Sequence, residues 1–238
     1  MRSSRSRERI GAFTRCLALL CCAGCARPQP RPPAPSCDPP AVLAAFQARE
    51  ARVRTLRARF TAQMVRAGAT RRVDGVLVMA KPDRFRFRLM LPFGVTVFDE
   101  VRDGARSWRL LPLGQPAADI DPLHLSELFL HGAEADPAQC ELAALGEGSI
   151  RVLCPARALR IRCADATVVE ALIGAPQAVG IRYDDLRSVA GIPLPFRIAL
   201  TYPGDVSVTV AIDRYEVNPR LAEDVFVPPP DAEVVAAP

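Results

Sequence analysis

The sequence has little of several residue types on which catalytic and metal sites depend. Its 238 residues include two histidines, His124 and His131, and one lysine, Lys81. The histidines have no acidic partners at metal-ligand spacing, so we expect surface or covering-segment positions for both. No GxSxG, HExxH, P-loop or GxGxxG motif occurs. We therefore expect no metal, no cofactor and no enzymatic activity.

Long hydrophobic runs are also missing. The apolar run near the N-terminus covers residues 16–24 and follows an arginine-rich stretch. A membrane-spanning helix needs about 20 apolar residues, so this run is too short to cross a bilayer. A basic start followed by a short apolar run is typical of a secretory signal peptide, which we place at residues 1–24.

An excess of one charge is missing once that signal peptide is set aside. The formal charge of the whole sequence is +5. Residues 1–24 contain five arginines and Glu8, so the remaining chain has 26 basic and 25 acidic residues. Nucleic-acid-binding proteins usually keep a basic face with a clear excess of positive charge. The sequence therefore predicts no nucleic-acid partner.

The sequence Cys22-Ala23-Gly24-Cys25 resembles the bacterial lipobox, in which small residues precede a cysteine that receives lipid. It departs from the usual pattern because Cys22 occupies the aliphatic position. We expect Cys25 to carry palmitate-type acyl chains, since two or more chains anchor a protein stably to a bilayer. The alternative is an ordinary signal peptide cut near Ala23 or Ala26.

Proline is abundant directly after Cys25. Residues 25–40 would form the lipidated cysteine and a Pro-rich tether, extended at about 3 Å per residue. A disordered leader without a spacing role is the alternative.

Four cysteines follow the tether's start, and an even number in an exported protein suggests disulfides. They are Cys37, Cys140, Cys154 and Cys163. Three pairings are possible. A hairpin turn at residues 146–149 would bring Cys140 opposite Cys154. That pairing leaves Cys37 with Cys163, which would pin the tether to the domain.

The hydrophobic periodicity predicts a mainly β domain at residues 41–230, with a flexible tail at 231–238. Residues 41–57 have the spacing of an amphipathic helix, with Val53 and Leu56 on its apolar face. A second helix is expected at residues 121–130, capped by Asp121. Period-two alternation then predicts about eleven antiparallel strands, which would curl into a sandwich or barrel-like sheet. Among them are 84–91, 149–154, 158–163, 167–173, 178–184, 195–202 and 206–217, with a short strand at 225–227.

Several segments share patterns with one protein family. Residues 83–94 form an arginine-alternating strand that runs into a Pro-Phe-Gly loop, and residues 60–63 read Phe-Thr-Ala-Gln after the N-terminal helix. Residues 75–85 contain Lys-Pro at 81–82, and residues 218–229 run from Asn-Pro to Pro-Pro. Over residues 41–115, and more weakly over 193–230, the chain resembles the LolA/LolB family of bacterial lipoprotein carriers and acceptors. Residues 83–94 are closest to LolB.

That resemblance implies a curved, incomplete antiparallel β-barrel covered by α-helices, with acyl chains held between sheet and helices. It also has departures. Lys81 stands where the carriers commonly have arginine, no aspartate follows Cys25, and cysteines in the body of the domain are unusual for LolB.

The resemblance also implies roles for particular residues. The expected cavity lining is Phe60, Met64, Phe85, Phe87, Leu89, Leu91, Val95, Val97 and Trp108. The expected lid residues are Leu125, Leu128 and Phe129, and the expected membrane-insertion loop is Pro92, Phe93 and Gly94. The alternatives are plain core packing for the lining, and a Phe93 side chain folded back over the end of the barrel.

Two functional hypotheses follow. In the first, the chain is a monomeric, lipid-anchored protein of the bacterial envelope, at the outer membrane facing the periplasm. It would bind acyl chains and accept or insert lipoproteins or lipids, as a chaperone that receives cargo from a periplasmic LolA-type carrier. In the second, the same fold is a non-transporting module for binding, sensing or assembly in the envelope. A hydrolase would need a polar constellation that the sequence does not contain.

Overall fold

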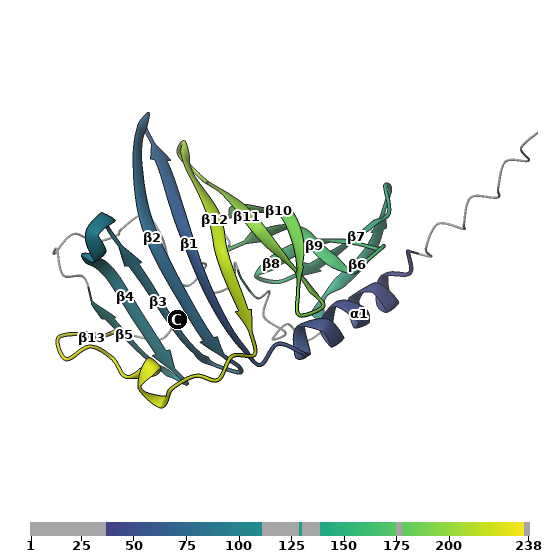
Figure 1. Ribbon diagram of the computed structural model, residues 1–238. Helices are drawn as coiled ribbons and strands as arrows, with labels where there is room; N and C mark the ends of the chain where they lie inside the picture. The colour runs from purple at the N-terminus through teal and green to yellow at the C-terminus, as the bar shows by residue number, and fades with distance from the viewer. Residues whose placement is uncertain (1–36, 111–128, 130–138, 175–177, 236–238) are drawn as a thin grey trace, which may run out of the picture. The chain divides into compact units, whose positions relative to one another are not determined.

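The computed structural model describes residues 37–110, 129, 139–174 and 178–235 (Figure 1). All of them belong to one compact unit, residues 35–238. The signal peptide, Cys25, most of the tether, His124, His131, Leu125, Leu128 and the rest of the helix expected at 121–130 apart from Phe129 lie outside the described residues. No helix within the described ranges combines the length and apolar character needed to cross a bilayer.

The described residues form one open antiparallel sheet of 13 strands (Figure 1). The strand order is β13-β5-β4-β3-β2-β1-β12-β11-β10-β9-β8-β7-β6. Of the two edge strands, β6 is the first arm of the hairpin predicted at residues 146–149, and β13 was not predicted. The strands are β1 Thr55–Arg66, β2 Ala69–Ala80, β3 Arg84–Met90, β4 Thr96–Asp103, β5 Arg106–Leu110, β6 Glu141–Leu145, β7 Ser149–Cys154, β8 Arg157–Arg162, β9 Thr167–Ile173, β10 Val179–Val189, β11 Ile192–Tyr202, β12 Val206–Val217 and β13 Glu233–Val235.

The two faces of this sheet differ in what covers them. One face, which we call the inner face, carries the main hydrophobic cluster, with Phe60, Phe87 and Ile198 almost fully buried. The opposite, outer face carries a small second cluster on β2, β4 and β5, where Val78, Val101 and Trp108 pack with Phe226. Elsewhere the side chains of the outer face are mostly polar or charged. Because strand side chains alternate between faces, β3 sends its phenylalanines inward and its arginines outward.

Helix α1 (Pro39–Ala51) packs on the inner face and is shorter than the sequence predicts. Asp38 caps its start, because the Asp38 side chain accepts a hydrogen bond from the Ala41 N–H at 3.2 Å. It ends near Arg52 because the following backbone finds other partners. The Asn218 side chain accepts from the N–H groups of Arg54 and Thr55, at 2.7 and 3.2 Å. The prediction that the helix continues to residue 57 is therefore wrong, and Leu56 is a β1 core residue.

The C-terminal segment also differs from its prediction. Residues 223–226 form a short 3-10 helix, η3 (Glu223–Phe226), in place of a strand at 225–227. The buried Phe226 ring lies against the outer face, with the Arg84 guanidinium carbon 4.9 Å from the ring centroid. The expected tail at 231–238 includes β13, which pairs with β5 in the register Val234↔Trp108. A lone three-residue strand has no periodicity to detect, so only pairing defines it.

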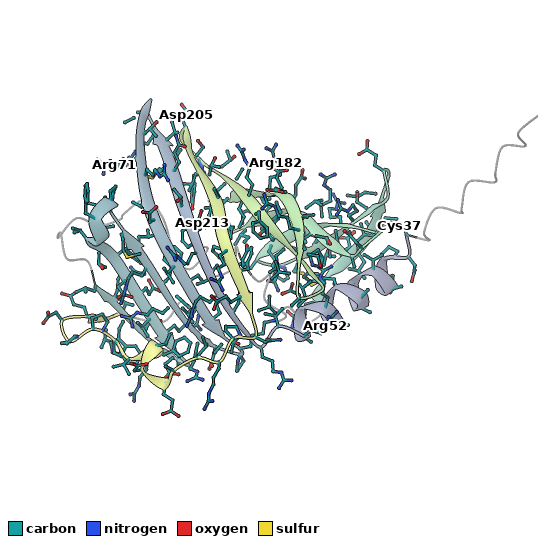
Figure 2. All side chains as sticks on the ribbon, viewed as in Figure 1. Cys37, Arg52, Arg71, Arg182, Asp205 and Asp213 are labelled. Carbon is teal, nitrogen blue, oxygen red and sulfur yellow. A yellow bond between two sulfur atoms is a disulfide. The ribbon has the colours of Figure 1, made fainter. Side chains whose placement is uncertain are left out.

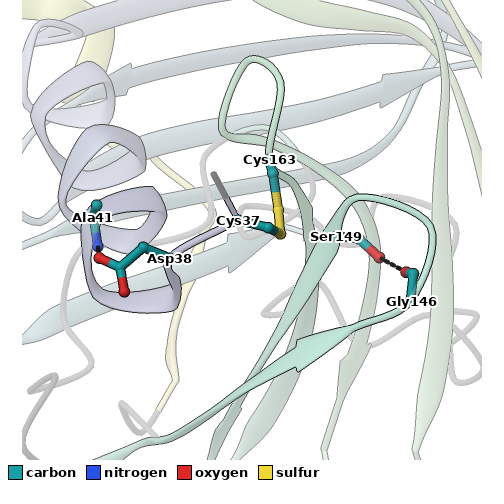
Figure 3. The surroundings of a disulfide bond; sticks show 6 residues. All are labelled: Cys37, Asp38, Ala41, Gly146, Ser149 and Cys163. Atoms are coloured by element: carbon teal, nitrogen blue, oxygen red, sulfur yellow. Dashed lines mark hydrogen bonds between the residues drawn. A yellow bond between two sulfur atoms is a disulfide. The ribbon is translucent and has the colours of Figure 1, made fainter. Parts of the chain in front are cut away.

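Both disulfide pairings inferred from the cysteine positions are confirmed. Cys140 and Cys154 lie opposite each other across the β6–β7 hairpin, with Cα atoms 4.4 Å apart. That separation is typical of a directly opposed, non-hydrogen-bonded pair of strand residues. Cys37 bonds to Cys163 and joins the start of α1 to the turn after β8 (Figure 3). The second bridge ties the entry of the domain to the sheet.

Candidate functional site

The inner face is lined by a connected group of aromatic rings. Phe60 on β1 stacks on Phe87 of β3, with ring centroids 5.6 Å apart, and Phe87 meets Phe98 at 6.1 Å. Phe129 lies 5.5 Å from Phe60 and 6.3 Å from Tyr215, and it is 2% exposed. Phe129, the one expected lid residue that the structure describes, thus contacts the sheet.

The nine residues predicted to line a cavity separate into three groups. Phe60, Phe85, Phe87 and Leu89 are buried on the inner face, and Met64 and Val97 are partly buried against the same cluster. Leu91 and Val95 are 38% and 50% exposed, because β3 ends at Met90 and they flank the following turn. Trp108 is wrong as a lining residue. It pairs with Val101 and packs in the outer-face cluster.

Gly75 is an inner-face residue that sequence reasoning missed. It lies directly opposite Phe60 in the register of β1 and β2. A Cβ atom at this position would collide with the Phe60 ring. Glycine therefore creates the space in which the ring lies flat against β2. The signal in the sequence is a glycine inside a strand, which often marks a close approach by another group.

The turn between β3 and β4 presents an apolar side chain to solvent. Phe93, in the short 3-10 helix η1 (Pro92–Gly94), is 103% exposed and has a φ of 75°. The Leu91 N–H donates to the Val95 carbonyl at 2.8 Å, which closes the turn and leaves the ring outside. The alternative in which Phe93 folds back is wrong. A bulky residue with positive φ costs about 1–3 kcal/mol, and such strain clusters at functional sites.

A charged pair interrupts the apolar inner face beside Phe98. Glu100 is fully buried and faces inward, opposite Phe87 and Arg109 in the sheet register. Arg109 donates to the Glu100 carboxylate through Nε at 3.0 Å and places Nη2 2.9 Å from the same oxygen. Its guanidinium also lies 5.7 Å from the Phe98 ring centroid. Sequence reasoning missed this pair, although the turn between β4 and β5 places the two residues opposite each other.

Similarity to known proteins was found in structure and not in sequence. No family model and no curated protein sequence matches this chain. The LolA superfamily protein NE2245 from Nitrosomonas europaea aligns over 79% of this chain and 97% of its own, with a TM-score of 0.58 and 9% identity. This chain has a LolA-like fold.

Two further structures agree with that assignment. A domain described as an outer membrane lipoprotein-sorting protein from Vibrio parahaemolyticus aligns over 78% of this chain and 95% of its own, at a TM-score of 0.57 and 12% identity. A DUF1329 family protein from Desulfovibrio piger aligns over 78% of this chain and 96% of its own, with a TM-score of 0.57 and 9% sequence identity. The predicted fold class, an open and curved antiparallel sheet of the LolA type, is confirmed. Identities this low establish the fold alone.

In this LolA-like fold Glu50, the buried acidic residue of α1, lies against Lys81 at the end of β2. Glu50 is 5% exposed, and its main-chain carbonyl accepts a hydrogen bond from Lys81 Nζ at 2.7 Å. The Glu50 carboxylate lies 3.9 Å from the same Nζ. Burial raises the pKa of Glu50 above its ordinary value of 4.5, although the charges of Lys81 and Arg49 oppose that shift. As for metals, the described ranges contain no group of three or more His, Cys, Asp or Glu side chains placed to bind an ion.

We expect the stability of this LolA-like domain to depend on the ionisation of Glu50. Since the folded pKa is raised, the folded state holds a proton that the unfolded state has lost. Stability therefore falls as pH rises through the interval between the ordinary and the raised pKa, and stays reduced above it. Glu50→Gln removes that loss, so the variant should be more stable at pH 7 and lack this slope. Urea unfolding from pH 4 to 8 measures both. A variant less stable than the natural protein at pH 7 would contradict the prediction.

Proposed function

We propose that this chain is a lipid-anchored lipoprotein of the bacterial envelope that binds acyl chains against the inner face and inserts lipoproteins or lipids into the outer membrane. Leaving an acyl chain of about 16 carbons in water forfeits about 13 kcal/mol of burial free energy. A carrier must therefore offer an apolar surface shielded from water. The aromatic group around Phe60, Phe87 and Phe129 is of this kind.

The exposed Phe93 ring is the observation that carries the delivery step. A fully exposed aromatic ring at a turn tip forgoes the free energy of burying its apolar surface, and here the backbone is strained as well. Both costs are offset if the ring enters a bilayer. Leu91 and Val95 on either side of the turn extend the apolar surface. We assign residues 91–95 as the membrane-insertion loop.

The anchor in this proposal is Cys25, with residues 26–36 as its tether. An extended Pro-rich segment covers about 3 Å per residue, so the lipid can stand up to about 40 Å from Cys37. The Cys37–Cys163 bond fixes the far end of that segment to the sheet. Such a tether keeps the insertion loop within reach of the membrane that holds the lipid. We place this membrane at the outer membrane, facing the periplasm.

The partners that follow from this function are acyl-bearing lipoproteins or other lipids and a periplasmic carrier of the LolA type. Cargo transfer of this kind breaks no covalent bond, so we propose a non-enzymatic role. One inner face per chain is enough for one cargo, and we propose that the chain acts as a monomer.

Replacing Phe93 with glutamate tests the delivery step. The protein beginning at residue 26 is loaded with a fluorescent lipid, and transfer to vesicles is followed over time. We expect Phe93→Glu to slow transfer at least tenfold, because a carboxylate in hydrocarbon costs about 2.5–3.5 kcal/mol. Lipid binding and thermal stability should be unchanged.

Val227→Glu is the matched control, since Val227 is 58% exposed and lies on a different segment. It should transfer lipid like the natural protein. Mass spectrometry of the natively purified protein should also show bound lipid. No bound lipid would overturn the proposal. Bound lipid with transfer unaffected by Phe93→Glu would favour the non-transporting binding module.

A further inference from the structure

The outer face of strands β6 to β11 carries a shallow open hollow of about 530 Å³. Small residues from three strands line it: Ala158 on β8, Gly180 on β10 and Ala199 on β11. A second hollow of about 450 Å³ shares Arg160, Glu170 and Arg182 with the first. Figure 2 shows Arg182 on the side of β10 away from α1. This face is thus opposite the one proposed to bind acyl chains.

The sheet register organises the hollow into two parallel rows of side chains. One row is charged and runs Arg151–Arg160–Glu170–Arg182 across β7, β8, β9 and β10. The neighbouring row runs Leu153–Ala158–Leu172–Gly180–Thr201. Leu153 and Leu172 are 43% and 49% exposed, with the small residues between and beside them. The apolar row thus has two exposed leucines with small residues, Ala158 and Gly180, between and beside them. It lies next to the charged row.

The charged row contains three arginines and only one carboxylate, so its positive charge is not fully neutralised within the row. Its one carboxylate, Glu170, accepts a hydrogen bond from Arg160 Nη2 at 2.7 Å, and Arg182 donates to Asp184 at 2.9 Å. Arg151 stands directly opposite Arg160, and like charges in opposed positions destabilise a sheet. Among the described residues Arg151 has no hydrogen-bond or ion-pair partner. The buried Nε of Arg160 has no acceptor there either.

We propose that this face docks an acidic, amphipathic segment of a partner protein. A carboxylate of that segment would bridge Arg151 and Arg160. An adjacent apolar side chain would fill the space above Ala158 and Gly180, on either side of Leu172. Protein interfaces combine an apolar centre with a polar rim in which arginine is enriched. An anionic membrane is a poorer fit, because a plane of phosphates would face Glu170, Asp184 and Asp185 as well as the arginines, whereas one carboxylate can contact Arg151 and Arg160 alone. A small free anion would leave the apolar row uncovered.

The dimensions of the face favour a transient contact. Strands β7 to β11 span roughly 19 Å across the sheet. An extended segment that crosses these strands is only about six residues long, and so short a contact falls below the roughly 800 Å² per partner of a standard stable interface. Reversible docking on the outer face also leaves the inner face free, so the proposal stands independently of lipid binding.

Two labelled peptides test the docking chemistry. One ten-residue peptide alternates glutamate with leucine, and the other alternates lysine with leucine. Fluorescence anisotropy with the folded protein should show at least tenfold tighter binding of the acidic peptide, which corresponds to about 1.4 kcal/mol. Equal affinities for the two peptides would overturn the proposal.

Three variants locate the site. Arg151→Gln should weaken the acidic peptide about fivefold, as expected for loss of an interfacial arginine. Gly180→Val should weaken it about as much by filling the hollow. A Cβ atom there meets only the Thr201 carbonyl oxygen at 3.9 Å, so the fold should tolerate it. Arg72→Gln removes an exposed charge on the distant β2 and should change nothing.

Other occupants give different results. If Arg72→Gln weakens binding as much as Arg151→Gln does, the attraction is to net charge and the proposal fails. Full displacement of the peptide by millimolar inorganic phosphate would assign the arginines to a small anion instead. Loss of binding to phosphatidylglycerol vesicles in Arg151→Gln but not in Phe93→Glu would assign the face to a membrane. Failure of lipid binding alone would leave this proposal intact.

Discussion

The Cys37→Ser/Cys163→Ser variant is expected to lose about 5 kcal/mol of unfolding free energy relative to the oxidised protein. The bond closes a loop with a sequence separation of 126 residues. It therefore removes much of the conformational freedom of the unfolded chain, and the effect grows with the logarithm of loop length. It also holds the start of α1, where Asp38 caps the helix.

The second disulfide is the matched comparison. Cys140–Cys154 has a separation of only 14 residues, so Cys140→Ser/Cys154→Ser should lose about 3 kcal/mol. Urea unfolding followed by circular dichroism, without reductant, measures both losses on one scale. If the short-loop variant loses as much as the long-loop variant or more, chain entropy does not explain the role of Cys37–Cys163.

Asp99→Ala is expected to cost about 3–5 kcal/mol, the range for removing one partner of a buried ion pair. Asp99 is 2% exposed on the outer face between two arginines of β3. It accepts hydrogen bonds from Arg86 at 2.9 and 2.8 Å and from Arg88 at 2.9 and 2.7 Å. Alanine would leave both guanidinium groups without this carboxylate.

The same substitution should loosen the C-terminal segment. Arg86 also donates to the Val225 carbonyl at 3.0 Å, which holds the segment around η3 against the outer face. Hydrogen exchange in residues 223–235 should therefore rise in Asp99→Ala. Asp103→Ala is the control on the same strand, because its side chain is 54% exposed and lies 4.0 Å from Arg84. That control should change stability by less than about 0.5 kcal/mol. Equal losses in the two variants would contradict the role given to Asp99.

Local patterns were sufficient where each residue's partner lies close in the chain. The Arg-Phe alternation of residues 84–90 predicted β3 and the direction of its side chains, since strand geometry alone sends alternate residues to opposite faces. The turn at residues 146–149 predicted Cys140–Cys154, because a hairpin defines which residues face each other. Strands β7, β9 and β12 begin and end where the sequence predicted.

Long-range pairing decided what local patterns could not. Val53 and Leu56 continue the helical spacing, but Asn218 takes up the backbone N–H groups and ends the helix. Trp108 is aromatic like Phe98, but it pairs with Val101 and its side chain therefore lies on the outer face. Phe60 and Ile212 are far apart in the sequence and are neighbours only through the register of β1 and β12.

The sequence by itself thus indicated the fold class, the Cys140–Cys154 pairing and the apolar turn at Phe93, because period-two patterns and turn residues are properties of the chain. Among the three possible cysteine pairings, the structure decided that Cys37 bonds to Cys163. The tertiary structure alone decided how strands distant in the sequence, such as β1 and β12, pair with each other, and where Glu50 is buried. The physical reason is register. A shift of one residue between neighbouring strands sends every side chain to the other face, and the register of distant strands follows from the packing of the whole sheet.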